Sequence, residues 1–294
     1  KSFRNSLMYA FFMNLFLDPL FILYFDFGVY GLAFATLVVQ AMACAYLAYK
    51  AYHSELIQKF LGQIYPIKYV YISEILKQGI PASVNIITMS SQIFIMNKYV
   101  RLFGGDYAVA GMGAGFRVEQ IVIVPTFALS IAAMTIIGQN FGAHKFARIR
   151  ETYLKSNIIG FSIVVVGGLV SALLGKYIIQ VFDPTPEVVE FGSTYLILSA
   201  LIMPSYVVTN VATASLQALQ YPNVPLFISV FRRLVLLWLA MEFFAVYLGM
   251  GMNGVLLSIA LLPWLGVIIF HIAAKTIIKR VEVKHGLYTI LVLA

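Results

Sequence analysis

An amide and a carboxylate lie one helical turn apart in the first apolar stretch of the chain. Asn14 and Asp18 are four residues apart, which puts both side chains on one face of a helix. Pro19 follows and has no backbone N–H, so the carbonyl of Leu15 loses its helical partner. A carboxylate, an amide oxygen and a free carbonyl suit a proton or a sodium ion, and Thr36 in the next apolar stretch could add a hydroxyl. The alternative is structural, an aspartate capped by a neighbour at a helix end.

Other ionisable residues also interrupt apolar stretches. A charged side chain at the centre of a bilayer costs roughly 2.5–3.5 kcal/mol, so such residues are functional clues. Glu242 is a second candidate proton carrier. Arg117 and Glu119 are two residues apart and point to different sides of a helix, so each is expected to meet another helix, in a buried ion pair or at a substrate. Arg232 and Arg233 lie near the start of a stretch and are expected to snorkel to the membrane surface.

The composition requires a membrane around these residues. Of 294 residues, 61% are hydrophobic and 11% are charged, whereas a soluble domain carries about 25% charged residues. The net charge of +8 falls mostly in short segments between apolar runs, not on one face, and this excludes a nucleic-acid partner. The single cysteine, Cys44, forms no intrachain disulfide.

The hydropathy pattern predicts an all-α integral membrane protein with about eight transmembrane helices. A helical span needs about 20 mostly apolar residues. Such runs occur at 5–25, 29–49, 79–102, 108–138, 157–181, 195–219, 226–248 and 251–274. The runs lack the alternation of β-barrel strands. The first run follows the basic Arg4 but has no cleavage site, so we interpret it as a genuine span of a truncated chain and not as a signal peptide.

The connections predict the orientation. Lys and Arg gather in 50–77, in 144–155 and after residue 274, whereas 103–107 and 182–194 hold only acidic charges. The positive-inside rule then places both ends of the chain in the cytoplasm of a multi-pass cell-membrane protein. Residues 54–70 are expected to be an amphipathic connector on the membrane surface. The Gly-x-x-Gly run at 28–31 has a weak echo at 251–254, and internal repeats are common in secondary transporters.

Several chemistries lack their usual signals. The chain has no phosphate-binding loop, no His/Cys cluster with metal-ligand spacing and no convergent set of catalytic groups. We therefore expect no enzyme, no metal and no cofactor, apart from a coupling ion, H⁺ or Na⁺.

The residues resemble the multidrug and toxic compound extrusion (MATE) transporter family. Two matches are specific: 14–22 (NLFLDPLFI) with 28–36 (GVYGLAFAT), and Arg117-Val118-Glu119 with 138–143 (GQNFGA). Weaker matches are 79–82 (GIPA) and 215–220 (SLQALQ). The family has twelve helices in two lobes, and this chain is similar to helices five to twelve, lacking the first four. The resemblance implies that 1–52 ends the amino-terminal lobe, 53–78 is a cytoplasmic inter-lobe loop, 79–280 is the six-helix carboxy-terminal lobe and 281–294 is a tail.

The resemblance also implies a function. Asn14, Asp18 and Thr36 match the family's cation site in type and spacing, and a further carboxylate on the family's first helix lies outside this chain. One branch has a Glu in the span that matches 79–102, where this chain has Asn85 and Gln92 but no carboxylate. That departure favours proton coupling at Asp18 over sodium coupling through the carboxy-terminal lobe.

The expected activity is therefore export of an organic, cationic drug or metabolite by a cation-coupled antiporter. The alternative is a related flippase for a lipid-linked or anionic substrate, which a cavity lined by Arg and Lys would favour. The expected partners are a small organic substrate and membrane lipids, with a monomeric chain that does not transport without its first four helices.

Overall fold

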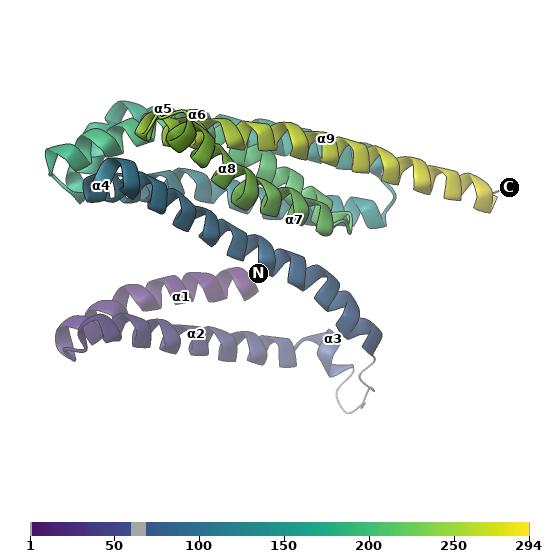
Figure 1. Ribbon diagram of the computed structural model, residues 1–294. Coiled ribbons are helices and arrows are strands. Elements are labelled where there is room, and N and C mark those ends of the chain that lie inside the picture. The colour runs from purple at the N-terminus through teal and green to yellow at the C-terminus, as the bar shows by residue number, and fades with distance from the viewer. Residues whose placement is uncertain (1, 60–68, 294) are drawn as a thin grey trace. The chain divides into compact units, whose positions relative to one another are not determined.

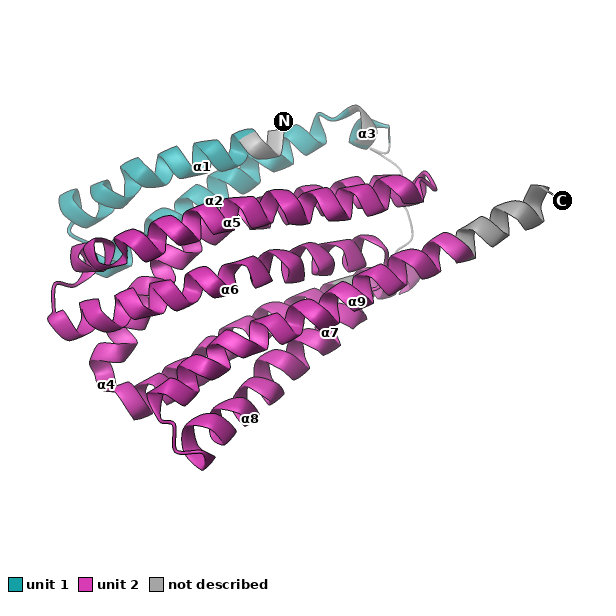
Figure 2. Cartoon of the chain, turned by 90° about the horizontal axis from the view of Figure 1, so that it is seen from above, with its two compact units in different colours: residues 1–68 teal, residues 69–294 magenta. Residues whose placement is uncertain are grey.

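The structure is a computed structural model whose described residues are entirely helical in their regular structure (Figure 1). It describes the backbone of residues 2–59 and 69–293, and the side chains of 5–54, 57–59, 69–77 and 79–283. The chain forms two compact units, residues 1–68 and 69–294 (Figure 2). The predicted all-α membrane fold is confirmed, because seven helices are long and apolar enough to cross a membrane.

Unit 1 is a hairpin of two long helices. Helix α1 (Ser2–Pro19) continues through the π-helix η1 (Leu20–Tyr24), and α2 (Gly28–Tyr52) returns beside it. The helical segments of this hairpin contain the predicted span 5–25, except its last residue, and the predicted span 29–49. Helix α3 (Glu55–Gln58) is a single turn. Within the predicted amphipathic connector 54–70, residues 60–68 lie outside the described residues.

Unit 2 begins with the longest helical segment, α4 (Tyr69–Gly142). Gly105 has a φ of 71° inside it, so α4 consists of two helices, 69–104 and 106–142. They contain the predicted spans 79–102 and 108–138, and this division gives eight apolar segments within the seven helices. Two further helices follow, α5 (Phe146–Phe182) and α6 (Pro186–Ala218).

The next segment of unit 2, residues 223–247, contains two wide π turns. Helix α7 (Asn223–Val230), η2 (Phe231–Leu236), α8 (Leu237–Met241) and η3 (Glu242–Tyr247) follow one another without a break. Helix α9 (Met252–Leu293) then runs helically through almost all of the segment 281–294. Wide π turns are rare in proteins and are frequent at functional sites.

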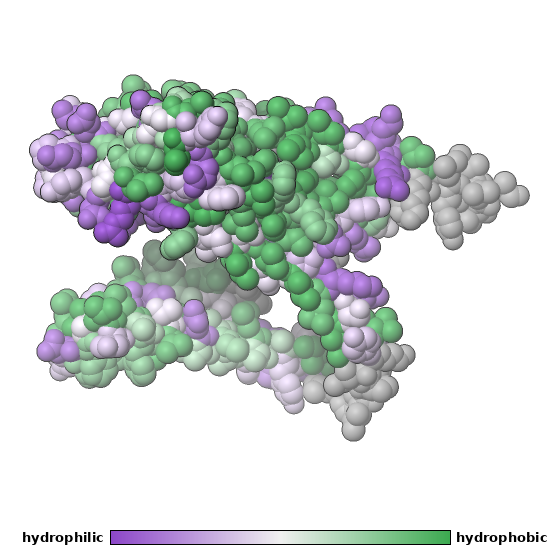
Figure 3. Space-filling model, viewed as in Figure 1, coloured by the Kyte–Doolittle hydropathy of each residue, from purple (hydrophilic) through white to green (hydrophobic). Residues whose placement is uncertain are grey.

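Helix α6 forms the centre of unit 2. It lies between α5 and α9 in Figure 2 and also packs on α4. In α6, 56% of the apolar window is buried, against 28% in α4 and α5, so the outer helices leave apolar side chains at the surface. Figure 3 shows hydrophobic side chains over much of unit 2, with hydrophilic ones gathered toward its ends. Exposing such an apolar surface to lipid tails costs no hydrophobic free energy, because the tails are themselves apolar.

The echo between 28–31 and 251–254 is also present in the backbone. Gly28 and Gly251 both have a positive φ, 52° and 56°, and each follows a π-helix. Three residues later, Gly31 and Gly254 pack on the backbone of the preceding π-helix, where a Cβ would meet it at 3.0 Å and 2.6 Å. The two hairpins are therefore closed by the same kind of turn, and a larger residue would fit at neither second glycine.

Candidate functional site

Asn14 and Asp18 lie on one face of α1 as predicted, in unit 1. The Oδ1 atoms of both side chains are buried and accept no hydrogen bond among the described residues. The structural alternative for Asp18 was a carboxylate capped by a neighbouring donor, and no described residue donates a hydrogen bond to its Oδ1. The backbone changes from α-helix to the π-helix η1 directly after Pro19. Two unused oxygens thus lie beside a local irregularity of the helix.

Thr36 is not joined to this pair by any described hydrogen bond. Its hydroxyl donates to the carbonyl of Leu32 in its own helix, at 2.8 Å, and the residue is exposed. A Thr hydroxyl retains acceptor capacity while it donates. The participation of Thr36 in an ion site with Asn14 and Asp18 therefore remains a prediction. The Oδ1 atoms of Asn14 and Asp18 are buried acceptors without a described partner.

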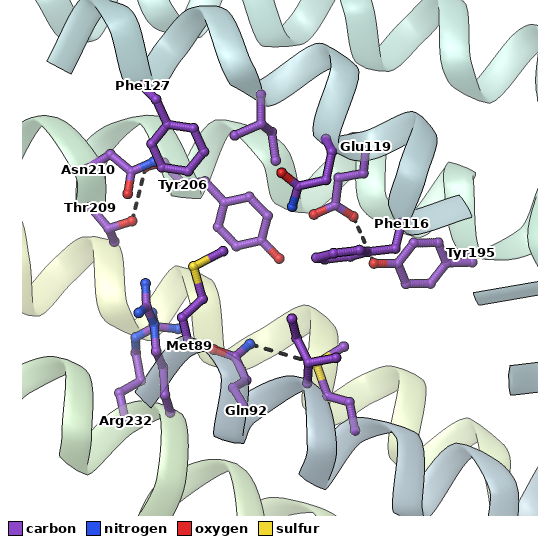
Figure 4. Close-up of a pocket in the computed structure, with 15 residues that line it drawn as sticks. Met89, Gln92, Phe116, Glu119, Phe127, Tyr195, Tyr206, Thr209, Asn210 and Arg232 are labelled. Carbon is purple, nitrogen blue, oxygen red and sulfur yellow. Dashed lines mark hydrogen bonds between the residues drawn. The ribbon is translucent and has the colours of Figure 1, made fainter. Parts of the chain in front are cut away.

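Unit 2 encloses a cavity of about 80 Å³. Side chains from the two halves of α4, from α6 and from η2 line it, and Figure 4 shows them around the ring of Tyr206. Its apolar wall consists of methionine, isoleucine and phenylalanine side chains: Met89, Ile93, Met96, Phe116, Ile123 and Phe127. Its polar groups are Gln92, Glu119, Gln120, Tyr195, Tyr206, Thr209, Asn210, Arg232 and Arg233.

Glu119 forms one end of the cavity and is held by α6. Its Oε2 accepts hydrogen bonds from the hydroxyls of Tyr195, at 2.8 Å, and Ser199, at 2.6 Å. The residue is only 3% exposed. Arg117 is exposed and forms no ion pair or hydrogen bond in the described part of the chain. The pair thus points to different sides as predicted, but Glu119 meets hydroxyls and not the ion-pair partner that one interpretation expected.

Arg232 and Arg233 form the opposite end, and the expectation that they snorkel is wrong. Arg232 is 3% exposed and lines the cavity together with Arg233. Figure 4 shows Arg232 and Glu119 on opposite sides of Tyr206. Both arginines lie in the π-helix η2, whose wider turn brings consecutive side chains closer in direction than an α-helix does. The tertiary packing of η2 against α4 and α9 encloses the guanidinium groups, which the sequence pattern alone places near a membrane surface.

Asn85 and Gln92 lie near these arginines, on the first half of α4. The Nη1 of Arg233 donates to the Oδ1 of Asn85 at 3.1 Å. Gln92 lines the cavity, and its Nε2 contacts the sulfur of Met96 at 3.7 Å. These two predicted residues therefore belong to the arginine end of the cavity.

Glu242 lies away from the cavity. The Tyr99 hydroxyl donates a hydrogen bond to its Oε1, joining the first half of α4 to η3. Tyr99 is buried, and Glu242 is half-buried. The structure thus gives Glu242 a partner within unit 2 but does not bring it together with Glu119.

Sequence reasoning missed Arg232, Arg233 and Tyr206 as cavity residues. The signal was an adjacent pair of arginines inside the predicted run 226–248, where each charge is costly in lipid. Tyr206 carries no signal of its own, because tyrosines are scattered through the chain. Among the described residues, no group of three or more His, Cys, Asp or Glu could hold a metal ion.

Seven helices of the described residues are long and apolar enough to cross a membrane, and those of unit 2 surround a cavity with polar and apolar walls, as expected of a multi-pass membrane protein with an internal binding site. The chain belongs to the MatE family, whose model matches residues 81–244, more than half of the chain. It therefore belongs to a transporter family and not to an enzyme family.

Individual relatives agree with this assignment. The chain is 28% identical over 204 residues to the probable multidrug resistance protein YpnP of Bacillus subtilis, covering 69% of this chain and 45% of that protein. It is 28% identical over 189 residues to the probable multidrug resistance protein NorM of Thermotoga maritima, covering 62% and 39%. The chain thus spans less than half of the curated relatives it matches.

Solved structures show the same fold. An outward-facing multidrug resistance MATE family transporter of the MOP superfamily aligns with a TM-score of 0.87 at 21% identity, over 94% of this chain and 62% of that one. A MOP superfamily transporter from Pyrococcus furiosus, described as having a binding pocket of reverse polarity, aligns with a TM-score of 0.84 at 21% identity, over 95% and 62%.

Proposed function

We propose that this chain is part of a cation-coupled antiporter that exports organic drugs or metabolites across the cell membrane. Membership of the MatE family supports the efflux activity, as do relatives described as multidrug resistance proteins. The observation that carries the coupling is the pair of buried, unpartnered Oδ1 atoms of Asn14 and Asp18. Buried oxygens without donors are costly, and a bound proton or sodium ion would remove that cost.

Coupling requires that the ion bind two states of the transporter unequally. Asp18 precedes Pro19 and the π-helix η1, so a change of charge at Asp18 would act where the helix is already irregular. The transporter with H⁺ or Na⁺ bound at Asp18 would favour one conformation, and the transporter with an empty site would favour the other. This gives export of substrate against import of the cation.

The test compares Asp18→Asn with Asp26→Asn in the transporter that contains these residues, reconstituted in liposomes. Asp26 is an exposed carboxylate in the same unit, so its variant controls for the loss of one acidic group. We expect Asp18→Asn to abolish ethidium export driven by an imposed H⁺ or Na⁺ gradient, and Asp26→Asn to export at the normal rate. A normal gradient-driven rate in Asp18→Asn would show that the coupling site lies elsewhere.

The alternative function, a flippase for a lipid-linked or anionic substrate, is favoured by one observation. The cavity in unit 2 has two arginines at one end and a single glutamate at the other. A cationic substrate, which the family resemblance implies, would be repelled at the arginine end. A solved MOP superfamily transporter with this fold is described as having a binding pocket of reverse polarity, which is consistent with this alternative.

Both ends of the chain lie in the cytoplasm, because the basic connections 144–155 and 275–284 share that side with the connection 50–77. The transporter works as a monomer in contact with lipid and takes a small organic substrate. Its only bound cofactor is the coupling ion.

A further inference from the structure

Two positive charges share one buried wall of the cavity without a negative partner. Arg232 and Arg233 are adjacent in η2, and neither forms an ion pair among the described residues. Glu119 lies at the other end of the cavity, and its Oε2 is already bound by Tyr195 and Ser199. Two like charges in a low-dielectric interior repel one another, and an isolated buried charge is expensive.

Most of the donors of this pair are unused. Each guanidinium presents five N–H groups in a planar fork. The described hydrogen bonds use one of these groups, from Arg233 to Asn85. The Nε of Arg232 is buried and has no partner. An arginine pair that served packing alone would be expected to satisfy these donors with helix carbonyls or a carboxylate.

The groups around the pair fit an anion with an apolar body. Tyr206 lines the cavity together with the arginines, and its hydroxyl makes none of the described hydrogen bonds. The side chains of Met89, Phe116 and Phe127 supply an apolar wall (Figure 4). A cavity of about 80 Å³ holds several atoms the size of a water oxygen.

We propose that Arg232 and Arg233, with Tyr206, form an anion subsite for an organic substrate that carries a carboxylate, phosphate or sulfonate. The planar forks bind such groups through paired charge-assisted hydrogen bonds. The apolar body of the substrate lies against the methionine and phenylalanine side chains. This inference rests on the proposed transport function for its biological meaning, but the binding that it predicts requires no transport.

The first experiment compares three probes that share one ring. The purified chain is incubated in detergent with benzoate, benzamidine or benzyl alcohol, which are anionic, cationic and neutral. Equilibrium dialysis of the labelled compounds gives their dissociation constants. We expect benzoate to bind at least tenfold more tightly than the other two. Equal binding of the three probes, or tighter binding of benzamidine, would overturn the proposal without any variant.

The second experiment assigns the binding to the arginines. Arg233→Gln keeps a polar side chain and removes the charge, and we expect it to weaken benzoate at least tenfold while benzyl alcohol is unaffected. Tyr206→Phe should weaken benzoate a few-fold. Arg101→Gln is the matched control, because Arg101 is exposed and pairs with Asp106 on the surface. Unchanged benzoate affinity in Arg233→Gln, or equal losses in Arg233→Gln and Arg101→Gln, would contradict the assignment.

A third arm distinguishes two sources of the anion. Benzoate binding is repeated in nanodiscs of phosphatidylcholine with and without phosphatidylglycerol. Competition by phosphatidylglycerol would support the subsite with a lipid headgroup as its occupant, and unchanged benzoate binding would support it with a soluble anion. Because these measurements need no ion gradient, they fail or succeed independently of the Asp18→Asn transport test.

Discussion

Arg232 packs directly on Gly266, which joins the π-helix η2 to α9. A Cβ at Gly266 would lie 2.8 Å from both the Cδ and the Nε of Arg232. Only glycine therefore leaves room for this guanidinium on the surface of α9. The position of one arginine of the cavity is thus set by a residue on another helix that does not line the cavity itself.

Gly266→Ala tests whether this contact positions the guanidinium. The atoms that the added methyl group meets belong to a flexible side chain, so we expect the fold to be retained and Arg232 to move. The affinity for benzoate should then fall about threefold to tenfold, as for one weakened hydrogen bond. Gly113→Ala is the control, because a Cβ there meets nothing within 4 Å. Unaltered benzoate binding in Gly266→Ala would show that Arg232 is positioned by other contacts.

Glu119→Ala tests the hydrogen bonds that hold the second half of α4 to α6. The substitution leaves the hydroxyls of Tyr195 and Ser199 without their acceptor in a buried place. We expect a loss of about 2–3 kcal/mol in the free energy of unfolding, measured in detergent by chemical denaturation. Glu190→Ala, an exposed glutamate on α6, should change it by less than about 0.5 kcal/mol. Similar losses in both variants would contradict the structural role of Glu119.

Tyr99→Phe tests the contact between α4 and η3. It removes the donor to the Glu242 carboxyl while keeping the ring. A typical hydrogen bond contributes about 0.5–1.5 kcal/mol, and we expect a loss of about this size in the free energy of unfolding. Tyr107→Phe, at an exposed tyrosine at the start of the second half of α4, is the control. In a double-mutant cycle with Glu242→Gln, additive effects would show that the two side chains are not coupled.

The turn between α5 and α6 should respond to pH. Hydrogen bonds from the side chain and then the backbone N–H of Thr185 hold the pKa of Asp183 below its ordinary value of 3.8. The backbone bond measures 2.9 Å. Because the pKa is lower in the folded state, the carboxylate stabilises the turn above about pH 4, and this contribution is lost as the pH falls through the lowered pKa.

An NMR titration of the Asp183 carboxyl carbon checks this prediction. We expect a midpoint below 3.8 in the native chain and a higher one in Thr185→Val, which loses the hydroxyl donor. A midpoint at or above 3.8 in the native chain would mean that Thr185 does not hold the carboxylate in solution.

The predicted spans were accurate because each depends on a local property. A run of about 20 apolar residues must be helical in lipid, since every backbone group needs a partner within the segment. The boundary between the spans 79–102 and 108–138 is also local, and it coincides with the positive φ of Gly105. The spacing of Asn14 and Asp18 was sufficient to place their side chains on one face.

The arginine pair could not be predicted in the same way. The sequence does not distinguish an Arg232 guanidinium that reaches water from one that is buried in protein, because a long side chain near the end of a span can do either. The burial of Arg232 depends on the packing of η2 against α4 and α9. Helix α4 is distant in sequence from η2, and α9 follows η2 only after α8, η3 and a turn. The partners of Glu119 were hidden for the same reason, since Tyr195 and Ser199 lie 76 and 80 residues away.

The sequence by itself determined that this protein is an α-helical membrane protein of the MatE family, because hydropathy and short motifs are carried by neighbouring residues. Only the tertiary structure decided which charges face the cavity. Helix packing brings Arg232 and Arg233 to one end of a single enclosed space and Glu119 to the other. The sequence alone does not give the distance in space between these side chains. The charge of a cavity is the sum over side chains from several helices, and that sum exists only after the helices have packed.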